Sequence, residues 1–309
     1  MKKRKRLGYV QCLGTSLNNR LLWISVVFLF IFFVPELLFG IVYIFTGYPP
    51  LPENLTFVFE MYVYSFLPTL LFVMLYTGLT KKNKPIFQSF MPKYGNNGLA
   101  SLGLGLLVGF LMNSACVVAA LLNGDISISF DFSVVQIPLY ILTLFCVCIQ
   151  SSTEEILTRG FLMERSRIHY PLWVAFIFNS VVFASLHLLN PGISALAVAD
   201  LVVVGLAYSA GAWYTKSIWF PMGMHTAWNF TQNFIFGLPN SGLVSQFSIF
   251  KLDAVIADIS WAYDPVFGVE GAVPAVFVDI LLFLICIYLG IKDGRGHELI
   301  SSLEKERRI

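Results

Sequence analysis

Two adjacent glutamates in an apolar stretch are the first residues of this sequence whose types and spacing indicate chemistry. Glu155 stands four residues before Arg159, and this order and spacing favour an ion pair on one face of a helix. Glu154 points about 100° away from Glu155 around the same helix, so it has no partner there. A carboxylate in that position is suited to act as a general base on a water molecule. The simpler interpretation is that both acids mark the cytoplasmic end of a membrane helix.

A histidine on the next apolar stretch is expected at the level of Glu154. Phe183 and His187 are four residues apart, and the chain turns back near Tyr170 and Pro171. Glu154 and His187 are equally far from that turn, so they lie at about the same height on facing helices. A glutamate and a histidine at one level can hold one water between them. The alternative is a histidine that makes a hydrogen bond within the helix packing.

A third pair, His225 and Asn229, shares one face of a later helix because the two residues are four apart. Two hydrogen-bond donors stacked one turn apart can stabilise a developing oxyanion. The alternative is a hydrogen bond between helices, which contributes about 0.6–2 kcal/mol. We expect Glu154, His187, His225 and Asn229 to converge on one polar cavity that is reached from the cytoplasmic side.

The composition places these residues in a membrane protein. Of the 309 residues, 57% are hydrophobic and 12% are charged, whereas soluble proteins are about 45–50% apolar and about 25% charged. A soluble enzyme, a nucleic-acid-binding protein and a disordered chain are therefore excluded. A membrane helix needs about 20 mainly apolar residues. The predicted spans are 21–45, 56–79, 99–122, 134–157, 172–190, 193–213, 217–237 and 272–291.

These spans predict an all-α membrane protein, a bundle of eight transmembrane helices with the polar site between the fourth, fifth and seventh. With the N-terminus in the cytoplasm, every Lys and Arg except Lys251 falls on the inner side, as the positive-inside rule requires. Both termini are then cytoplasmic, and the longest outer segment is about 238–271. The predicted division is a basic N-terminal tail at 1–20, a membrane domain at 21–291 with its motif core at about 150–230, and a C-terminal tail at 292–309.

Taken together, the three motifs resemble a known family. Glu-Glu-x-x-x-Arg at 154–159, Phe-x-x-x-His at 183–187 and His-x-x-x-Asn at 225–229 are similar to the motifs of the CAAX-processing and bacteriocin-processing (ABI/CPBP) intramembrane proteases. The resemblance covers about 150–230, a quarter of the chain. The eight-span count agrees with it, and the other spans add no specific signal.

The resemblance implies a role for each residue of the motifs. Glu154 and His187 would activate the hydrolytic water, and His225 and Asn229 would stabilise the oxyanion. Glu155, Arg159 and Phe183 would support them. The implied enzyme is an intramembrane protease that cleaves a peptide bond by direct attack of water. It is either of the glutamate type or metal-dependent, in which case Glu154, His187 and His225 would bind zinc; the absence of His-Glu-x-x-His favours the metal-independent form.

Other functions are compatible with the same polar cluster. A noncatalytic immunity protein or a transporter would use it for binding, since acids and histidines inside spans also mark solute paths. Glu36, Glu60, Asp200 and Asp279 would then matter as much as Glu154. The two aspartates lack the Gly-x-Gly-Asp context of an aspartyl intramembrane protease.

The expected partners are the lipid bilayer and a peptide or protein substrate in or at the membrane, with no nucleic acid. The short polar tails favour a multi-pass protein of a bacterial plasma membrane. In that setting a role in peptide processing or bacteriocin self-immunity is favoured over cleavage of a prenylated protein. The sequence assigns no oligomeric state.

Overall fold

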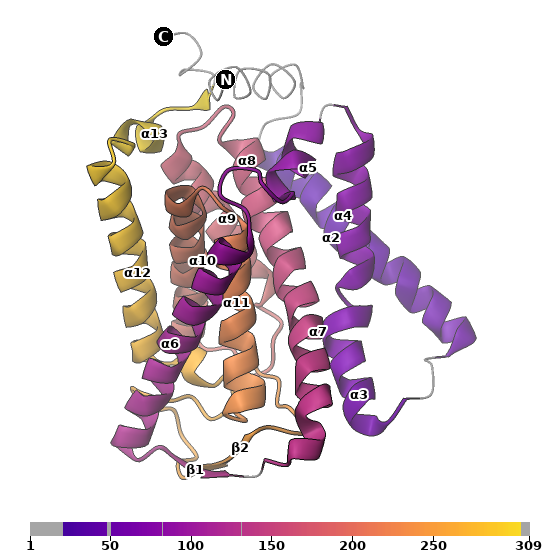
Figure 1. Ribbon diagram of the computed structural model, residues 1–309, viewed down its shortest axis with the longest axis vertical. Helices are drawn as coiled ribbons and strands as arrows, with labels where there is room; N and C mark the ends of the chain where they lie inside the picture. Colours follow the sequence, from indigo (N-terminus) through magenta and orange to yellow (C-terminus); the bar gives the residue numbers. More distant parts are fainter. Residues whose placement is uncertain (1–20, 48–50, 82, 131, 304–309) are drawn as a thin grey trace.

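The computed structural model describes residues 21–47, 51–81, 83–130 and 132–303, and most of them are helical (Figure 1). The predicted tail at 1–20 and the end of the other tail, 304–309, lie outside the described residues. The α-helices are α2 (Leu21–Thr46), α3 (Glu53–Val58), α4 (Leu67–Leu79), α5 (Lys84–Phe90), α6 (Leu99–Asn123), α7 (Ile137–Glu155), α8 (Met163–Ser166), α9 (Leu172–Leu186), α10 (Ala195–Thr215), α11 (Trp219–Phe230), α12 (Val273–Lys292) and α13 (Gly296–Ile300).

Short π-helical and 3₁₀ segments interrupt or extend these helices, and two strands pair at one end of the bundle. The π-helical segments are η1 (Phe59–Tyr64), η3 (Ile156–Leu162) and η4 (Thr231–Ile235), and the 3₁₀ turns are η2 (Val134–Gln136) and η5 (Val269–Gly271). Strands β1 (Ile126–Phe130) and β2 (Phe250–Ala254) form an antiparallel pair. The eight-span prediction did not include this pair.

The predicted membrane bundle is confirmed. Among the described residues, six helical segments are long and apolar enough to cross a membrane: Leu21–Thr46, Glu53–Leu79, Leu99–Asn123, Ile137–Ser166, Ala195–Thr215 and Val273–Lys292. The remaining two predicted spans are shorter: α9 ends at Leu186, and α11 is continued by η4. The span predicted over 172–190 is therefore too long, because His187 already caps the helix and a turn follows at Asn190–Gly192.

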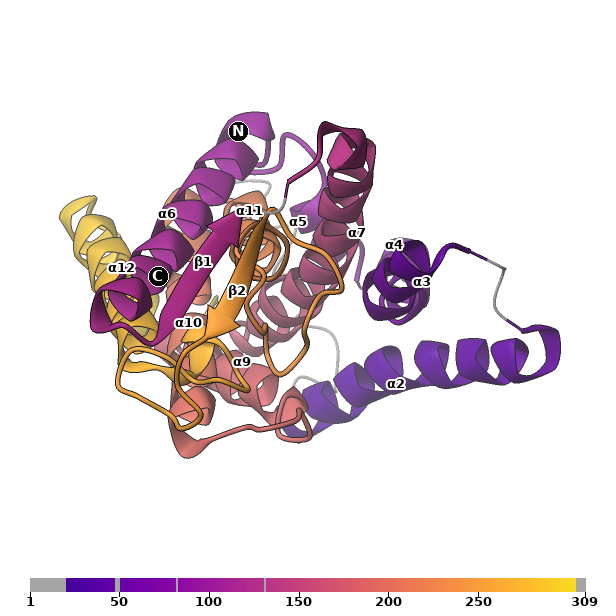
Figure 2. The same ribbon diagram turned by 90° about the horizontal axis from the view of Figure 1, so that it is seen from below.

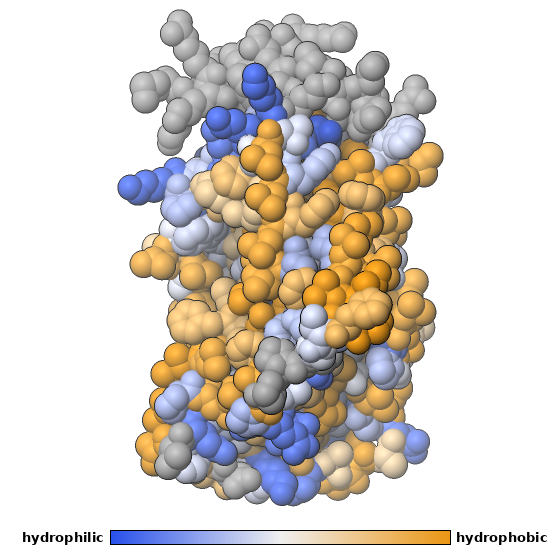
Figure 3. Space-filling model, turned by 90° about the vertical axis from the view of Figure 1, so that its right-hand side faces the viewer, coloured by the Kyte–Doolittle hydropathy of each residue, from blue (hydrophilic) through white to orange (hydrophobic). Residues whose placement is uncertain are grey.

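The outer surface of the bundle fits a lipid environment. Large apolar side chains are exposed along the helices, for example Phe45 on α2 (84%), Leu122 on α6 (85%) and Phe277 on α12 (65%). On the face that Figure 3 shows, an apolar band lies between polar ends. Seen from below, α2 extends away from the other helices (Figure 2). An exposed apolar belt of this size marks a membrane-facing surface.

Close helix contacts fix the helices that carry the motifs. A Cβ atom on Gly105 of α6 would meet the carbonyl oxygen of Phe220 on α11, and one on Gly205 of α10 would meet Ser180 on α9. Small residues at such crossings let the helix backbones approach each other closely. As a result α11 lies against α6, and α9 against α10. Helices α5, α8 and α13 lie at one end of the bundle, with β1 and β2 at the other (Figure 1).

Candidate active site

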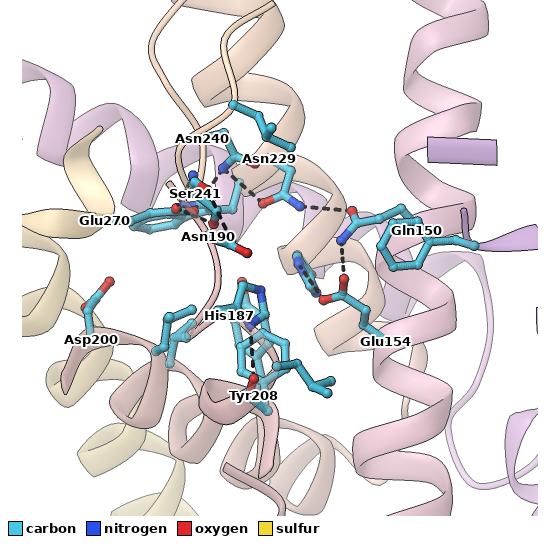
Figure 4. Close-up of a pocket in the computed structure, with 18 of the residues that line it drawn as sticks. Gln150, Glu154, His187, Asn190, Asp200, Tyr208, Asn229, Asn240, Ser241 and Glu270 are labelled. Atoms are coloured by element: carbon cyan, nitrogen blue, oxygen red, sulfur yellow. Dashed lines mark hydrogen bonds and ion pairs between the residues drawn. The ribbon is translucent and has the colours of Figure 1, made fainter. Parts of the chain in front are cut away.

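A cavity of about 210 Å³ lies inside the bundle and brings the predicted catalytic residues together. Glu154, His187, His225 and Asn229 all line it, although they come from α7, the end of α9, and α11. Figure 4 labels Glu154, His187 and Asn229 around it. The predicted convergence on one cavity is therefore seen in the structure. Their catalytic roles stay predictions.

Only one oxygen of the Glu154 carboxylate accepts a hydrogen bond from the described residues. Oε1 accepts a hydrogen bond of 2.7 Å from Nε2 of Gln150, one turn earlier on α7. Oε2 is buried, has no hydrogen-bond partner among the described residues and lies 3.7 Å from Nε2 of His225. The π-helical segment η3 begins two residues later, and such segments occur frequently at functional sites. Oε2 is thus an acceptor of Glu154 that no hydrogen bond from the described residues occupies.

Glu155 connects two other site residues behind the cavity wall. Its Oε1 lies 2.9 Å from Nη1 of Arg159, so the predicted ion pair is present. The same oxygen lies 3.1 Å from Nδ1 of His225. When Nδ1–H donates to Glu155, Nε2 is the ring atom that faces Glu154. Glu155 therefore sets the orientation of His225 in the way that a carboxylate orients a catalytic histidine.

Arg159 is fully buried beneath the cavity, and its charge is surrounded by acceptors and rings. Besides Glu155, it donates to the hydroxyl of Thr158 (2.9 Å) and to the carbonyl oxygen of Gly205 (3.1 Å). The guanidinium carbon lies 4.8 Å from the centroid of the Phe183 ring and 5.4 Å from that of Tyr208. Cation–π contacts of this kind stabilise a desolvated arginine. Sequence reasoning did not identify Tyr208.

Phe183 supports both histidines as well as Arg159. Its ring centroid lies 4.8 Å from that of His187 and 6.1 Å from that of His225. Its carbonyl oxygen lies 3.0 Å from Nδ1 of His187, which leaves Nε2 of that ring for other partners. No hydrogen bond or ion pair joins His187 to Glu154 among the described residues, and both face the same cavity. A water molecule between them is the arrangement that was expected from the hairpin.

Asn229 is held by amides that sequence reasoning missed. Its Nδ2 donates to Oε1 of Gln150 (3.0 Å), and its Oδ1 accepts from Nδ2 of Asn240 (3.3 Å). Gln150 thereby connects Glu154 with Asn229 across the cavity. Its position four residues before Glu154 was the available signal in the sequence. No comparable signal marks Asn240, which follows α11 and η4 in the predicted outer segment.

Glu270, from η5 in the same segment, completes this chain of contacts. Its carboxylate accepts hydrogen bonds from Trp228 Nε1 (2.9 Å), Asn240 Nδ2 (2.9 Å), and the backbone N–H (2.8 Å) and hydroxyl (2.7 Å) of Ser241. Burial raises the pKa of Glu270, and the hydrogen bonds from Ser241 and Trp228 oppose that rise. These residues line the cavity toward the end that carries β1 and β2, the outer end in the predicted orientation. Approach from the cytoplasmic side stays a prediction.

The side chains proposed as zinc ligands do not form a ligand set in this arrangement. Among the described residues, no three His, Cys, Asp or Glu side chains are placed to hold one metal ion together. Glu154, His187 and His225 line the cavity without converging on a common point in that way. The metal-independent form, which the sequence favours over the zinc form, stays a prediction.

Comparison with known families identifies this core. Residues 135–231 match the family model described as type II CAAX prenyl endopeptidase Rce1-like. This match supports the resemblance of the motif core to the CAAX-processing (CPBP) family of membrane proteases. The match runs from η2 to the start of η4 and includes all the motif residues, but it ends before Asn240 and Glu270. No curated protein and no solved structure matches the chain.

Proposed function

We propose that this protein is an intramembrane endopeptidase of the CAAX-processing (CPBP) type, in which Glu154 activates a water molecule for attack on a peptide bond. The observation that carries the proposal is the free Oε2 atom of Glu154. It is buried without a hydrogen-bond partner among the described residues, and Glu154 lines a cavity that His187, His225 and Asn229 also line. A general base needs an unoccupied acceptor within reach of the water, and an oxyanion needs donors on the far side of the carbonyl group.

The reaction begins with a water molecule between Glu154 and His187. Glu154 takes a proton from the water as the oxygen attacks the carbonyl carbon, and the carbonyl oxygen becomes an oxyanion. In this step both ring nitrogens of His225 are protonated, so Nδ1–H donates to Glu155 and Nε2–H donates to the oxyanion, and an N–H of Asn229 donates to it as well. When the C–N bond breaks, Glu154 returns the proton to the leaving amine. No covalent intermediate with the protein forms, because water is the nucleophile.

The substrate we propose is a peptide or protein segment in or at the membrane. One wall of the cavity is formed by apolar or aromatic side chains. They are Phe32 on α2, Met61 and Tyr62 on η1, and Phe66, which precedes α4. Such a wall suits a hydrophobic residue next to the cleaved bond. In a bacterial plasma membrane, a processed peptide fits this description better than a prenylated protein. We propose, as the distribution of Lys and Arg predicts, that both termini are cytoplasmic.

Replacing Asn229 by alanine tests the oxyanion step. We expect kcat for cleavage of a hydrophobic peptide to fall by about 10²–10³-fold, with a smaller change in KM, because the lost donor acts mainly in the transition state. The matched control is Asn123→Ala at the exposed end of α6, which should leave kcat unchanged. An equally small loss of kcat in both variants would mean that Asn229 does not stabilise the oxyanion.

Chelation tests the metal requirement. We expect full activity after dialysis against 1,10-phenanthroline and EDTA, because Glu154 itself serves as the base and no step of the proposed reaction needs a Lewis acid. The rates before dialysis, after dialysis and after return of zinc are compared, with a zinc peptidase treated in parallel. A loss of activity that zinc restores would replace the glutamate-type reaction by a metal-dependent one.

A further inference from the structure

Three carboxylates besides Glu154 line the same cavity, and the proposed reaction uses none of them. Asp200 lies on α10, Glu270 on η5 and Asp279 on α12. They are 3%, 8% and 1% exposed, respectively. We call this group the acidic compartment. In Figure 4, Asp200 and Glu270 lie on one side of His187, and Glu154 lies on the other.

The two aspartates of the compartment have unsatisfied oxygens. Both carboxylate oxygens of Asp279 and Oδ1 of Asp200 are buried without a hydrogen-bond partner among the described residues. Leaving buried polar atoms unpaired is costly. Glu270 differs, because four hydrogen bonds from neighbouring groups already hold it in place. The compartment therefore has one fixed acid and two acids that lack donors.

The cavity wall also lacks a permanently cationic side chain beside its acids. The residues that line it include four acids and two histidines but no lysine or arginine. Arg159 lies behind the wall, where Glu155 pairs with it. Acids buried together repel one another, and buried charges are normally paired. A cationic group with several N–H donors would supply the hydrogen bonds and the positive charge that the described residues of the cavity wall do not provide.

We propose that the acidic compartment binds a cationic group of the substrate, an ammonium or a guanidinium, beside the cleaved bond. An ammonium has three N–H donors and a guanidinium has five, so either can contact several spaced oxygens at once. The compartment is less suited to one metal ion, because no three of its acidic side chains are placed to hold one together. The preferred substrate is therefore a hydrophobic peptide with a basic residue or a free amino terminus.

Contacts with the catalytic side of the cavity explain how such a group would set the cleavage position. Glu270 and Asn229 both accept a hydrogen bond from Nδ2 of Asn240. A cation in the compartment that contacts Glu270 would thus be joined through Asn240 to Asn229, one of the proposed oxyanion donors. This inference rests on the proposed peptidase function, which names Asn229 as one of those donors.

The test uses the full-length protein in nanodiscs and a set of synthetic peptides. All peptides are hydrophobic and C-amidated. In the first, N-acetylated set, one lysine occupies a different position in each peptide, and in the second, also N-acetylated set, norleucine replaces that lysine. A third set has norleucine and a free amino terminus. Binding is measured with the Glu154→Gln variant, and kcat/KM with the active protein. We expect the best lysine or free-amine peptide to exceed its acetylated norleucine partner at least about tenfold in both measurements.

Two variants assign the preference to the compartment. Asp279→Asn and Asp200→Asn should each reduce the ratio between the cationic and the neutral peptide to near one, whereas Glu53→Gln, at the exposed start of α3, should leave the ratio unchanged. A ratio near one in the unaltered protein, or a preference that survives both substitutions, would overturn the proposal. If cationic peptides bind by way of these aspartates but no peptide is cleaved, the compartment stands and the peptidase function is wrong. If peptides are cleaved without any charge preference, the peptidase function stands and the proposal for the acidic compartment is wrong.

Discussion

Replacing Glu154 by glutamine is expected to lower peptide hydrolysis by about 10²–10⁴-fold while the protein stays folded. Glutamine keeps the shape of the side chain and an oxygen that can accept the hydrogen bond from Gln150. It replaces the free Oε2 atom by an amide nitrogen, which cannot take a proton from water. The measurement is the rate of product formation by reconstituted protein, together with the thermal unfolding midpoint of each variant.

A matched glutamate provides the control for Glu154. Glu60 also lies in a predicted span, on η1, but it does not line the cavity. Glu60→Gln should therefore retain activity. A transporter that uses acids along a solute path would be impaired by both substitutions. Activity that survives Glu154→Gln and disappears in Asp279→Asn would mean that the aspartates, and not Glu154, carry out the catalytic step.

Replacing Arg159 by methionine is expected to lower the free energy of unfolding by about 3–5 kcal/mol. Methionine fills much of the same volume but leaves Glu155 buried without its cationic partner. The side chains of both residues are fully buried, and Arg159 also contacts Gly205 and the rings of Phe183 and Tyr208. Unfolding in mixed micelles by increasing amounts of SDS, followed by circular dichroism, measures the loss.

An ion pair nearer the protein surface provides the comparison for Arg159. Arg167 pairs with Glu164 at 3.2 Å, and both side chains are partly exposed. Arg167→Ala should cost about 0–1 kcal/mol, as exposed pairs usually do. The double variant Glu155→Gln with Arg159→Met should be less destabilised than the sum of the two single variants. Additive losses would mean that the two residues do not act as a buried pair.

Hydropathy predicts most of this fold, because lipid imposes a length and a composition on each span. The limits of α2, α6 and α12 are within a few residues of the predicted spans. The π-helical segments leave no mark in hydropathy, since their extra residue changes the backbone and not the composition. The early end of α9 was missed for a related reason. Leu188 and Leu189 continue the apolar run after the helix has ended at Leu186.

The candidate site is predictable where spacing along one helix decides the geometry. The i to i+4 relation indicates the pair of Glu155 and Arg159, and the structure confirms that pair. The contact of His225 with Glu155 joins two helices that are 70 residues apart in sequence, so no local spacing reveals it. Asn240 and Glu270 come from a long segment without periodicity. Tertiary hydrogen bonds place them at the cavity.

Mass spectrometry of peptide products formed in ¹⁸O-water tests the central claim most directly. Protein reconstituted in liposomes is given the synthetic peptide set, and both products and intact protein are weighed over time. The account predicts that each new carboxyl terminus carries one ¹⁸O atom, that no peptide becomes attached to the protein, and that Glu154→Gln yields almost no product. A protein–peptide adduct, or equal product from the unaltered protein and the Glu154→Gln variant, would contradict it.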